Sequence, residues 1–129
     1  MKRHLAIFIG NAIEKILQGE KAVEARFSIS KILPYESIMK EDEIYLKQSG
    51  GLVLGKVKVD NVLYYEGLNA EVIGKLRREY QNDLLVDNKF WQDHANSKYA
   101  TIIFLKDPKK FIAPLRITKH DRRSWMIIQ

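Results

Sequence analysis

The first thirty residues change from one hydrophobic spacing to another. The run from His4 to Ile9 is apolar and contains β-branched residues, which predicts a strand. Apolar residues then recur at helical spacing, with Asn11 as the N-cap, Glu14 completing a capping box and Gly19 ending the helix. From Val23 to Phe27 apolar and charged residues alternate, which predicts a strand with one apolar and one charged face.

Later segments alternate in the same way between turn residues, after a loop at Ser30–Lys40. In chain order the expected elements are a strand at Asp42–Lys47, a hairpin turn at Gln48–Gly51, a strand at Leu52–Tyr65 bent at Gly55, a helix from Asn69 to about Tyr80, a helix or turn at Phe90–Ala95, a central strand at Tyr99–Leu105, an edge strand or extended loop at Phe111–Ile117, which contains Pro114, and a final strand at Ser124–Ile128. This pattern predicts one α+β domain over residues 1–129. Its five to six strands and two to three short helices fit a small mixed β-barrel with helices at the rim.

Several classes of chemistry are excluded by composition. The chain has no cysteine, which excludes a disulfide scaffold, a thiol nucleophile and thiolate metal sites. His4, His94 and His120 share no ligand-like spacing, so no metal is expected. The sequence contains neither a P-loop nor a G-x-S-x-G elbow, and no cofactor is predicted.

The location follows from the apolar segments. None approaches the roughly 18 apolar residues of a membrane span, so no membrane partner is expected. The apolar run near the start is short and is broken by Glu14 and Lys15, which is unlike a signal peptide. A cytoplasmic location is therefore predicted.

The chain is basic, with a net charge of +6 and a pI of about 9.5, which favours anionic partners and nucleic acid above all. Residues 106–129 carry seven Lys or Arg and two Asp, a net +5. Lys119, Arg122 and Arg123 in this segment are candidate phosphate contacts. Trp125 beside them, and Trp91, are interpreted mainly as core residues; stacking on an unpaired base is the alternative.

The stretch GEKAVEARF, Gly19 to Phe27, concentrates charge beside an apolar pattern. On a strand Glu24 and Arg26 share one face, and Lys21 lies just before it. In a partly dry site such a cluster needs mutual neutralisation, and Arg26 would offer planar donors to a phosphate, carboxylate or base edge. The residues alone favour the plainer alternative, a solvated strand face with cross-strand ion pairs.

The spacing G-x-K-x-x-E-x-R formed by Gly19, Lys21, Glu24 and Arg26 resembles the signature of the ASCH domain family, in the PUA-like superfamily. The strand, hairpin and strand of EDEIYLKQSGGLVLGKVKV and the later FW and KYATIIFL segments also resemble that family, so the likeness covers about Leu5 to Leu105. It implies a PUA-like barrel in which the motif lines a cleft that binds RNA.

The resemblance implies two functions. The main hypothesis is binding of RNA or a nucleotide at the motif, with Lys47, Ser49 and Lys98 as further contacts. The alternative is a small hydrolase acting on RNA or a modified nucleoside, with Lys21 and Glu24 as the acid–base pair.

Some ASCH proteins are amidohydrolases acting on N4-acetylcytidine, and others are ribonucleases. In the amidohydrolase type a Thr nucleophile follows the Lys by three residues, whereas here that position is Glu24 and the hydroxyl is missing. Glu66 and Glu71 are candidates for the separate Glu of that type. A third alternative is a protein-interaction domain whose basic face binds an acidic partner.

Overall fold

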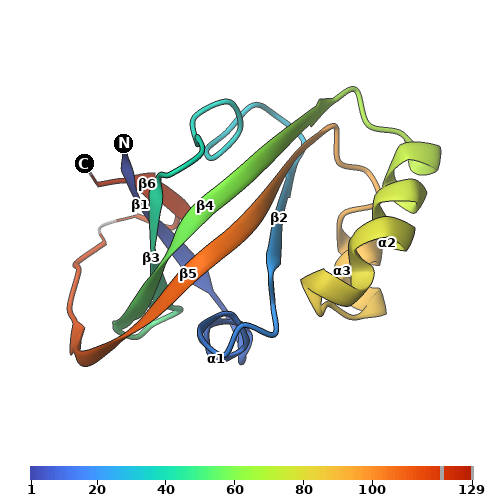
Figure 1. The fold of residues 1–129 in the computed structure, drawn as a ribbon. Helices are drawn as coiled ribbons and strands as arrows, with labels where there is room; N and C mark the ends of the chain where they lie inside the picture. Colours follow the sequence, from blue (N-terminus) through green and yellow to red (C-terminus); the bar gives the residue numbers. More distant parts are fainter. Residues whose placement is uncertain (120, 129) are drawn as a thin grey trace.

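Six strands and three helices are formed by the residues that the structure, a computed structural model, describes, 1–119 and 121–128 (Figure 1). In chain order they are β1 (Arg3–Phe8), α1 (Ala12–Leu17), β2 (Val23–Ser28), β3 (Glu43–Gln48), β4 (Val53–Glu66), α2 (Ala70–Leu84), α3 (Asn88–Asp93), β5 (Tyr99–Leu115) and β6 (Trp125–Ile127). The predicted α+β class is confirmed.

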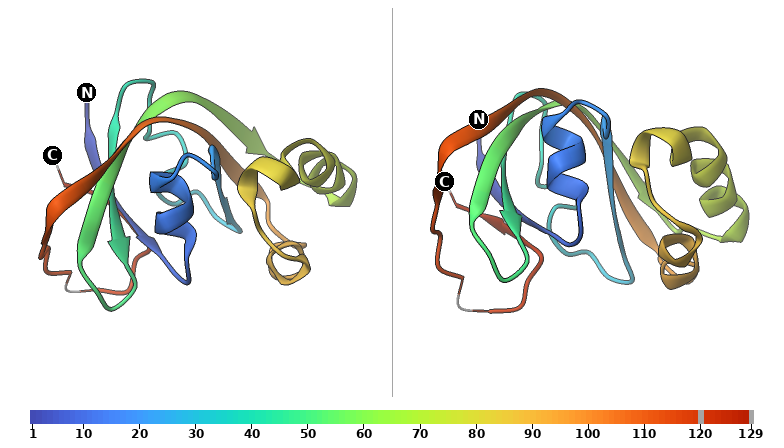
Figure 2. Two further views of the ribbon diagram at one scale, coloured as in Figure 1. Left: turned by 60° about the horizontal axis from the view of Figure 1, so that its bottom comes forward. Right: turned by 90° about the horizontal axis from the view of Figure 1, so that it is seen from below.

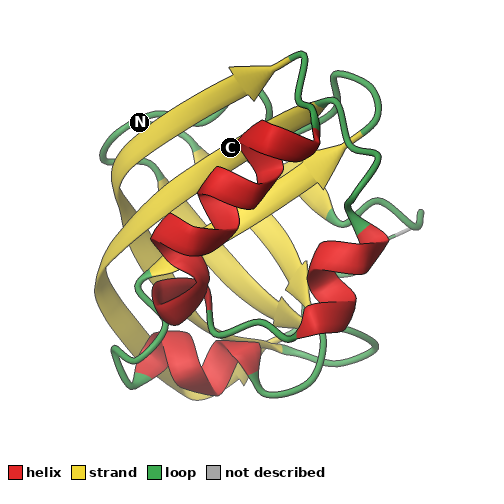
Figure 3. Ribbon diagram, turned by 90° about the vertical axis from the view of Figure 1, so that its right-hand side faces the viewer, coloured by secondary structure: helices red, strands yellow, loops and turns green. Residues whose placement is uncertain are grey.

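The strands form one mixed sheet in the order β2-β5-β4-β3-β1-β6, and the sheet curls into a half-barrel. Strands β1 and β3 are parallel, whereas the other neighbours are antiparallel. Figure 2 shows α1 inside the curl and α2 and α3 beyond the end of the β4–β5 pair. Figure 3 shows α2 and α3 from their exposed side.

Two apolar cores hold these layers together. One lies under α1 and includes Ile13, Ile16 and Val57. The other lies between the sheet and α2, where Ile73 and Leu76 are buried among its members. Strand β2 therefore has a core on its α2 side. Two of the charged motif residues, Glu24 and Arg26, lie within this strand.

The segment Phe111–Ile117, predicted as an edge strand or an extended loop, is not an element of its own; its residues up to Leu115 are the end of β5, which there has a neighbour only on the β4 side. Strand β5 continues without a break from Tyr99 to Leu115 and pairs with β4 as far as Val53 opposite Leu115. Three register shifts along this pair let the two long strands bend, and Pro114 is exposed within the continued strand. The predicted Tyr99–Leu105 segment lies in the interior of the sheet, between β2 and β4.

Gly55 marks the predicted bend, at one of these register shifts. A Cβ atom at this position would lie 2.5 Å from the backbone oxygen of Lys109 and 2.9 Å from Leu17 Cδ2. Glycine therefore permits β5 and α1 to approach β4 together.

The predicted caps differ between the two helices. The side chain of Asn11 makes no cap hydrogen bond, so the capping box with Glu14 is wrong; Asn11 has a φ of −103° and a ψ of 17° instead of an extended backbone. The side chain of Asn69 does cap α2, accepting from the Val72 amide at 2.9 Å. Helix α2 continues past Tyr80 to Leu84 because Leu84 extends its buried face.

Candidate functional site

A cleft of about 990 Å³ lies between the β1–α1 turn, strand β2 and the α2–α3 corner. These bordering elements can be followed in the right-hand view of Figure 2. Lys21, Glu24 and Arg26 all line it, so the structure brings the three motif residues together. The motif places them there because Lys21 lies two residues before β2 and the other two lie within this strand.

Lys21 and Glu24 form a buried ion pair. Lys21 is 4 % exposed, and its Nζ lies 3.2 Å from Glu24 Oε1. The same ammonium donates a 2.5 Å hydrogen bond to the carbonyl oxygen of Leu84, at the end of α2. The lysine thus satisfies a carbonyl at the helix terminus and joins α2 to the motif.

Glu24 stands between two cations. Its Oε2 accepts a 2.9 Å hydrogen bond from Arg26 Nε. Burial acts to raise the pKa of this carboxyl, but Arg26 and Lys21 outweigh it, so the pKa is lowered. The carboxylate is therefore held in its charged, accepting form.

The guanidinium of Arg26 is held on two sides by aromatic rings. Its Cζ lies 4.9 Å from the centre of the Phe8 ring and 5.1 Å from that of Trp125. Nη2 donates to the Ile7 carbonyl oxygen at 3.0 Å and Nη1 to that of Ser124 at 3.4 Å. Strands β1 and β6 therefore fix the orientation of the motif arginine.

A buried hydrogen-bonded chain supports Trp125 from behind. Its Nε1 donates to His4 Nδ1 at 3.0 Å, and His4 Nε2 lies 2.8 Å from Asp42 Oδ2. Burial acts to raise the pKa of Asp42, but hydrogen bonds from the Lys2 amide, His4 and the Met39 amide outweigh it and the pKa is lowered. The ionised Asp42 accepts the Nε2 proton, which leaves Nδ1 of His4 free to accept from the indole.

Both tryptophans pack in the core. Trp125 is 2 % exposed and Trp91 is 4 % exposed. Their main interpretation as core residues is confirmed.

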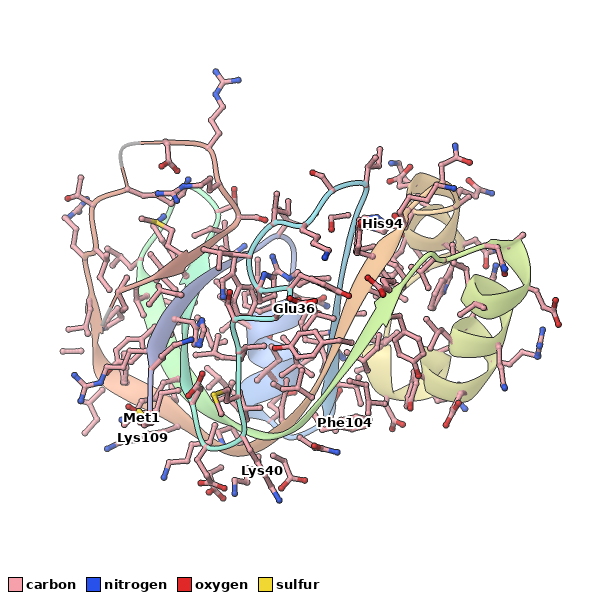
Figure 4. All side chains as sticks on the ribbon, turned by 90° about the horizontal axis from the view of Figure 1, so that it is seen from above. Met1, Glu36, Lys40, His94, Phe104 and Lys109 are labelled. Atoms are coloured by element: carbon pink, nitrogen blue, oxygen red, sulfur yellow. The ribbon has the colours of Figure 1, made fainter. Side chains whose placement is uncertain are left out.

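An aromatic wall forms another part of the cleft. The rings of Phe27 and His94 stack with centroids 5.3 Å apart, and Phe90 contacts His94 at 4.6 Å. Sequence reasoning did not assign Phe27 and His94 to the site. The position of Phe27 next to the motif was the available signal, whereas His94 reaches the cleft only through the placement of α3. Figure 4 labels His94 among the surrounding side chains.

The cleft lining is balanced in charge. It contains four basic and four acidic residues: Lys15, Lys21, Arg26, Lys89, Glu20, Glu24, Asp87 and Asp93. Outside the motif, Lys15 pairs with Glu20 at 3.0 Å and Lys89 with Asp93 at 2.7 Å. The cleft therefore offers hydrogen-bonding groups without an excess of positive charge.

Three predicted contacts lie elsewhere. Lys47 is buried and donates to the Gln48 carbonyl at 3.3 Å, and Ser49 is exposed at the hairpin. Lys98 is exposed and precedes β5. Among the described residues, these three are not part of the cleft lining.

The predicted C-terminal contacts lie beside Ser124, which lines the cleft. Lys119 donates to the backbone oxygen of Asp121, and Arg123 Nε donates to its carboxylate at 2.8 Å. Arg122 is exposed. This short segment is therefore basic but partly neutralised by Asp121.

Two features are absent from the described residues, 1–119 and 121–128. They contain no group of three or more His, Asp or Glu side chains placed to hold a metal ion. His120, which is not expected to bind a metal, lies outside the described residues. None of their helices has the length and apolar character needed to cross a bilayer. The cytoplasmic location stays a prediction.

Solved structures share this architecture. The ASCH protein of Zymomonas mobilis matches with a TM-score of 0.75 at 15% identity, over 99% of this chain and 88% of that one. A tyrosine-to-phenylalanine variant of that protein gives 0.76 at 15% identity, over 100% and 91% of the two chains. A hypothetical protein gives 0.57 at 22% identity, over 84% and 99%.

No protein-family model matches the chain, and no curated protein matches it. At these identities the likeness to solved structures concerns the arrangement of the backbone. The predicted recognition is confirmed at that level: this chain has the ASCH-type, PUA-like fold.

Proposed function

We propose that this domain binds RNA or a nucleotide through the cleft beside Lys21, Glu24 and Arg26, and does so in the cytoplasm. The observation that carries the proposal is that one cleft combines the charged motif with a wall of aromatic rings. A nucleobase offers a flat face for stacking and an edge for hydrogen bonds. Its face would lie on the aromatic wall and its edge would meet the motif.

The motif retains hydrogen-bonding capacity for such an edge. A guanidinium has five N–H donors, and Arg26 gives three of them to Glu24, Ile7 and Ser124. Its side chain is 18% exposed, so the other donors are within reach of a ligand. The ionised Glu24 would accept from an exocyclic amino group.

Because the cleft lining has no excess of positive charge, we expect the phosphates of a ligand to contact a different part of the protein. Lys119, Arg122 and Arg123 lie within five residues of Ser124 in the sequence, and Ser124 lines the cleft. Phosphates on either side of a bound base would contact these residues. Non-specific binding of this kind is roughly micromolar and weakens with salt.

Binding is better supported than hydrolysis. A general base works best with a pKa near the working pH, but the pKa of Glu24 is lowered by its two cationic neighbours, against the effect of burial. Lys21 is already held by Leu84 and Glu24. Both partners of the alternative acid–base pair are thus engaged in structural contacts.

The test is fluorescence anisotropy with labelled short RNAs and single nucleotides, comparing the wild type with Phe27→Leu and Arg26→Lys. Phe27→Leu keeps an apolar side chain but removes the stacking face, and we expect roughly 5- to 150-fold weaker binding, the value of one base–aromatic stack. Arg26→Lys keeps the charge but removes the planar donors, and we expect it to weaken binding as well.

Lys98→Gln is the control, because Lys98 is exposed and outside the cleft lining. It should leave the affinity for a single nucleotide unchanged. Circular dichroism should show that every variant is folded. Equal affinity of wild type and Phe27→Leu would refute the cleft as the binding site, and RNA cleavage that is lost in Glu24→Gln would replace binding by the hydrolase alternative.

A further inference from the structure

The β4–β5 pair carries lysines that lie directly opposite one another. Lys56 is opposite Lys109, and Lys58 is opposite Lys106. Opposite residues of an antiparallel pair share one face of the sheet, as do residues two apart on one strand. Val57 between the two β4 lysines is 1% exposed and points into the core, so the four lysines face outward. We call them the outer lysine face.

This arrangement is unfavourable for the isolated protein, since like charges in opposite positions of a sheet repel each other. Two of the four lysines are neutralised, Lys56 by Glu43 at 2.7 Å and Lys106 by Glu41. Among the described residues, Lys58 and Lys109 form no ion pair within 4.0 Å, although Lys58 lies opposite Glu43 of β3 and its charge lowers the pKa of Glu41. Lysines without an ion pair thus remain on both strands.

Aromatic rings adjoin the outer lysine face. Tyr45 of β3 lies opposite Lys56, whose Nζ is 5.9 Å from the centre of the Tyr45 ring. The ring of Phe111 lies 5.9 Å from that of Tyr45. Both aromatic residues are only partly buried. Lysines beside accessible aromatic rings are the side chains with which proteins hold a nucleic-acid strand.

The outer lysine face is separate from the cleft. Among the described residues that line the cleft, none belongs to this face. In the view of Figure 4, Lys109 is labelled at the lower left of the molecule and His94 of the cleft at the upper right. A ligand on the outer lysine face would therefore leave the cleft open.

We propose that the outer lysine face binds the phosphodiester backbone of a nucleic-acid strand, as a second contact independent of the cleft. Alternate residues on a strand are about 6.6 Å apart, and neighbouring strands about 4.8 Å, so the four ammonium groups form a compact cationic array. A flexible polyanion neutralises such an array and relieves the repulsion within it. Unpaired bases would stack on Tyr45 and Phe111, whereas the carboxylates of an acidic peptide have no such stacking face.

The experiment measures the salt dependence of binding to a labelled single-stranded RNA of about 20 nucleotides, between about 50 and 200 mM salt. The variant is Lys58→Gln/Lys109→Gln, which removes the two lysines without an ion pair. Each lost phosphate contact on a single strand should reduce the slope of log affinity against log salt by about 0.7, so a reduction of about 1.4 is expected. Affinity for a single nucleotide should not change.

The matched control is Lys75→Gln/Arg78→Gln, which removes two exposed charges from α2. It should keep the wild-type slope. An unchanged slope in Lys58→Gln/Lys109→Gln, an equal reduction in the control, or no RNA binding at the lowest salt would each overturn the proposal. If polyglutamate binds the wild type as tightly as RNA does, and Lys58→Gln/Lys109→Gln weakens both interactions equally, the face would be assigned to an acidic protein. A reduced slope in Lys58→Gln/Lys109→Gln, together with unaltered nucleotide binding by Phe27→Leu, would refute the cleft as a binding site and still support this second contact.

Discussion

The cleft and the outer lysine face treat charge in opposite ways. In the cleft each motif cation contacts Glu24, and basic and acidic residues occur in equal number. On the outer lysine face two cross-strand pairs of lysines are adjacent, and two of the four form no ion pair within 4.0 Å among the described residues. The first arrangement favours a rigid pocket for one small polar ligand, and the second favours a long polyanion.

Removing the charge of Glu24 should give the largest effect on stability. Glu24→Gln leaves Lys21 and Arg26 close together without their shared anion. Loss of one member of a buried charged cluster typically costs about 3–5 kcal/mol, and we expect a decrease of that order in the free energy of unfolding in urea.

Asp93→Asn is the matched control for this change. Asp93 pairs with Lys89 on the surface of α3, where both side chains are more than half exposed. Surface pairs contribute little to stability. A loss in Glu24→Gln no larger than in Asp93→Asn would show that the motif ion pairs contribute no more to stability than a surface pair does.

A smaller effect is expected on the pH dependence of stability. Burial lowers the pKa of His4 below 6.5, against the raising effects of Asp42 and with a minor contribution from Lys2. Below pH 6.5 the unfolded chain takes up a proton that the folded chain resists. The stability from neutral His4 is therefore complete above pH 6.5 and is lost as the pH falls through the folded-state pKa.

The measurement is the free energy of unfolding of wild type and His4→Gln between about pH 7 and 5. The variant should be less stable at pH 7, but its free energy of unfolding should decline less steeply as the pH falls. His94→Gln serves for comparison, because burial also lowers the pKa of His94. Parallel curves for wild type and His4→Gln would contradict the role assigned to His4.

The smallest effect should come from the outer lysine face. Lys58→Gln/Lys109→Gln removes like charges that repel across the β4–β5 pair. The free energy of unfolding should be unchanged or slightly raised, within about 0.5 kcal/mol. A clear loss of stability would show that these lysines serve the fold.

What the sequence could predict was local. The motif cluster needs contacts only between Lys21, Glu24 and Arg26, which are three and two residues apart. The strand pattern around it follows from alternation, so the charged side of β2 was predictable. The curling of the sheet into a half-barrel also agreed with the pattern of apolar strands.

Features that depend on distant pairing were not predictable. The outer lysine face exists because Lys56 and Lys58 meet residues about fifty positions later, and register shifts fix which ones meet. The continuation of β5 past Pro114 depends on the same shifts, which hydrophobic periodicity does not encode. His94 and the chain from Asp42 through His4 to Trp125 likewise required the packed structure.

The hold on Arg26 also has a consequence for biosynthesis. The guanidinium receives its last contacts from Ser124 and Trp125, and Ser124 lies 98 residues further along the chain. His4 and Trp125 are separated by 121 residues. Contacts of such separation form late, since a long loop must close first. During translation, the motif side of the cleft therefore stays incomplete until β6 has left the ribosome.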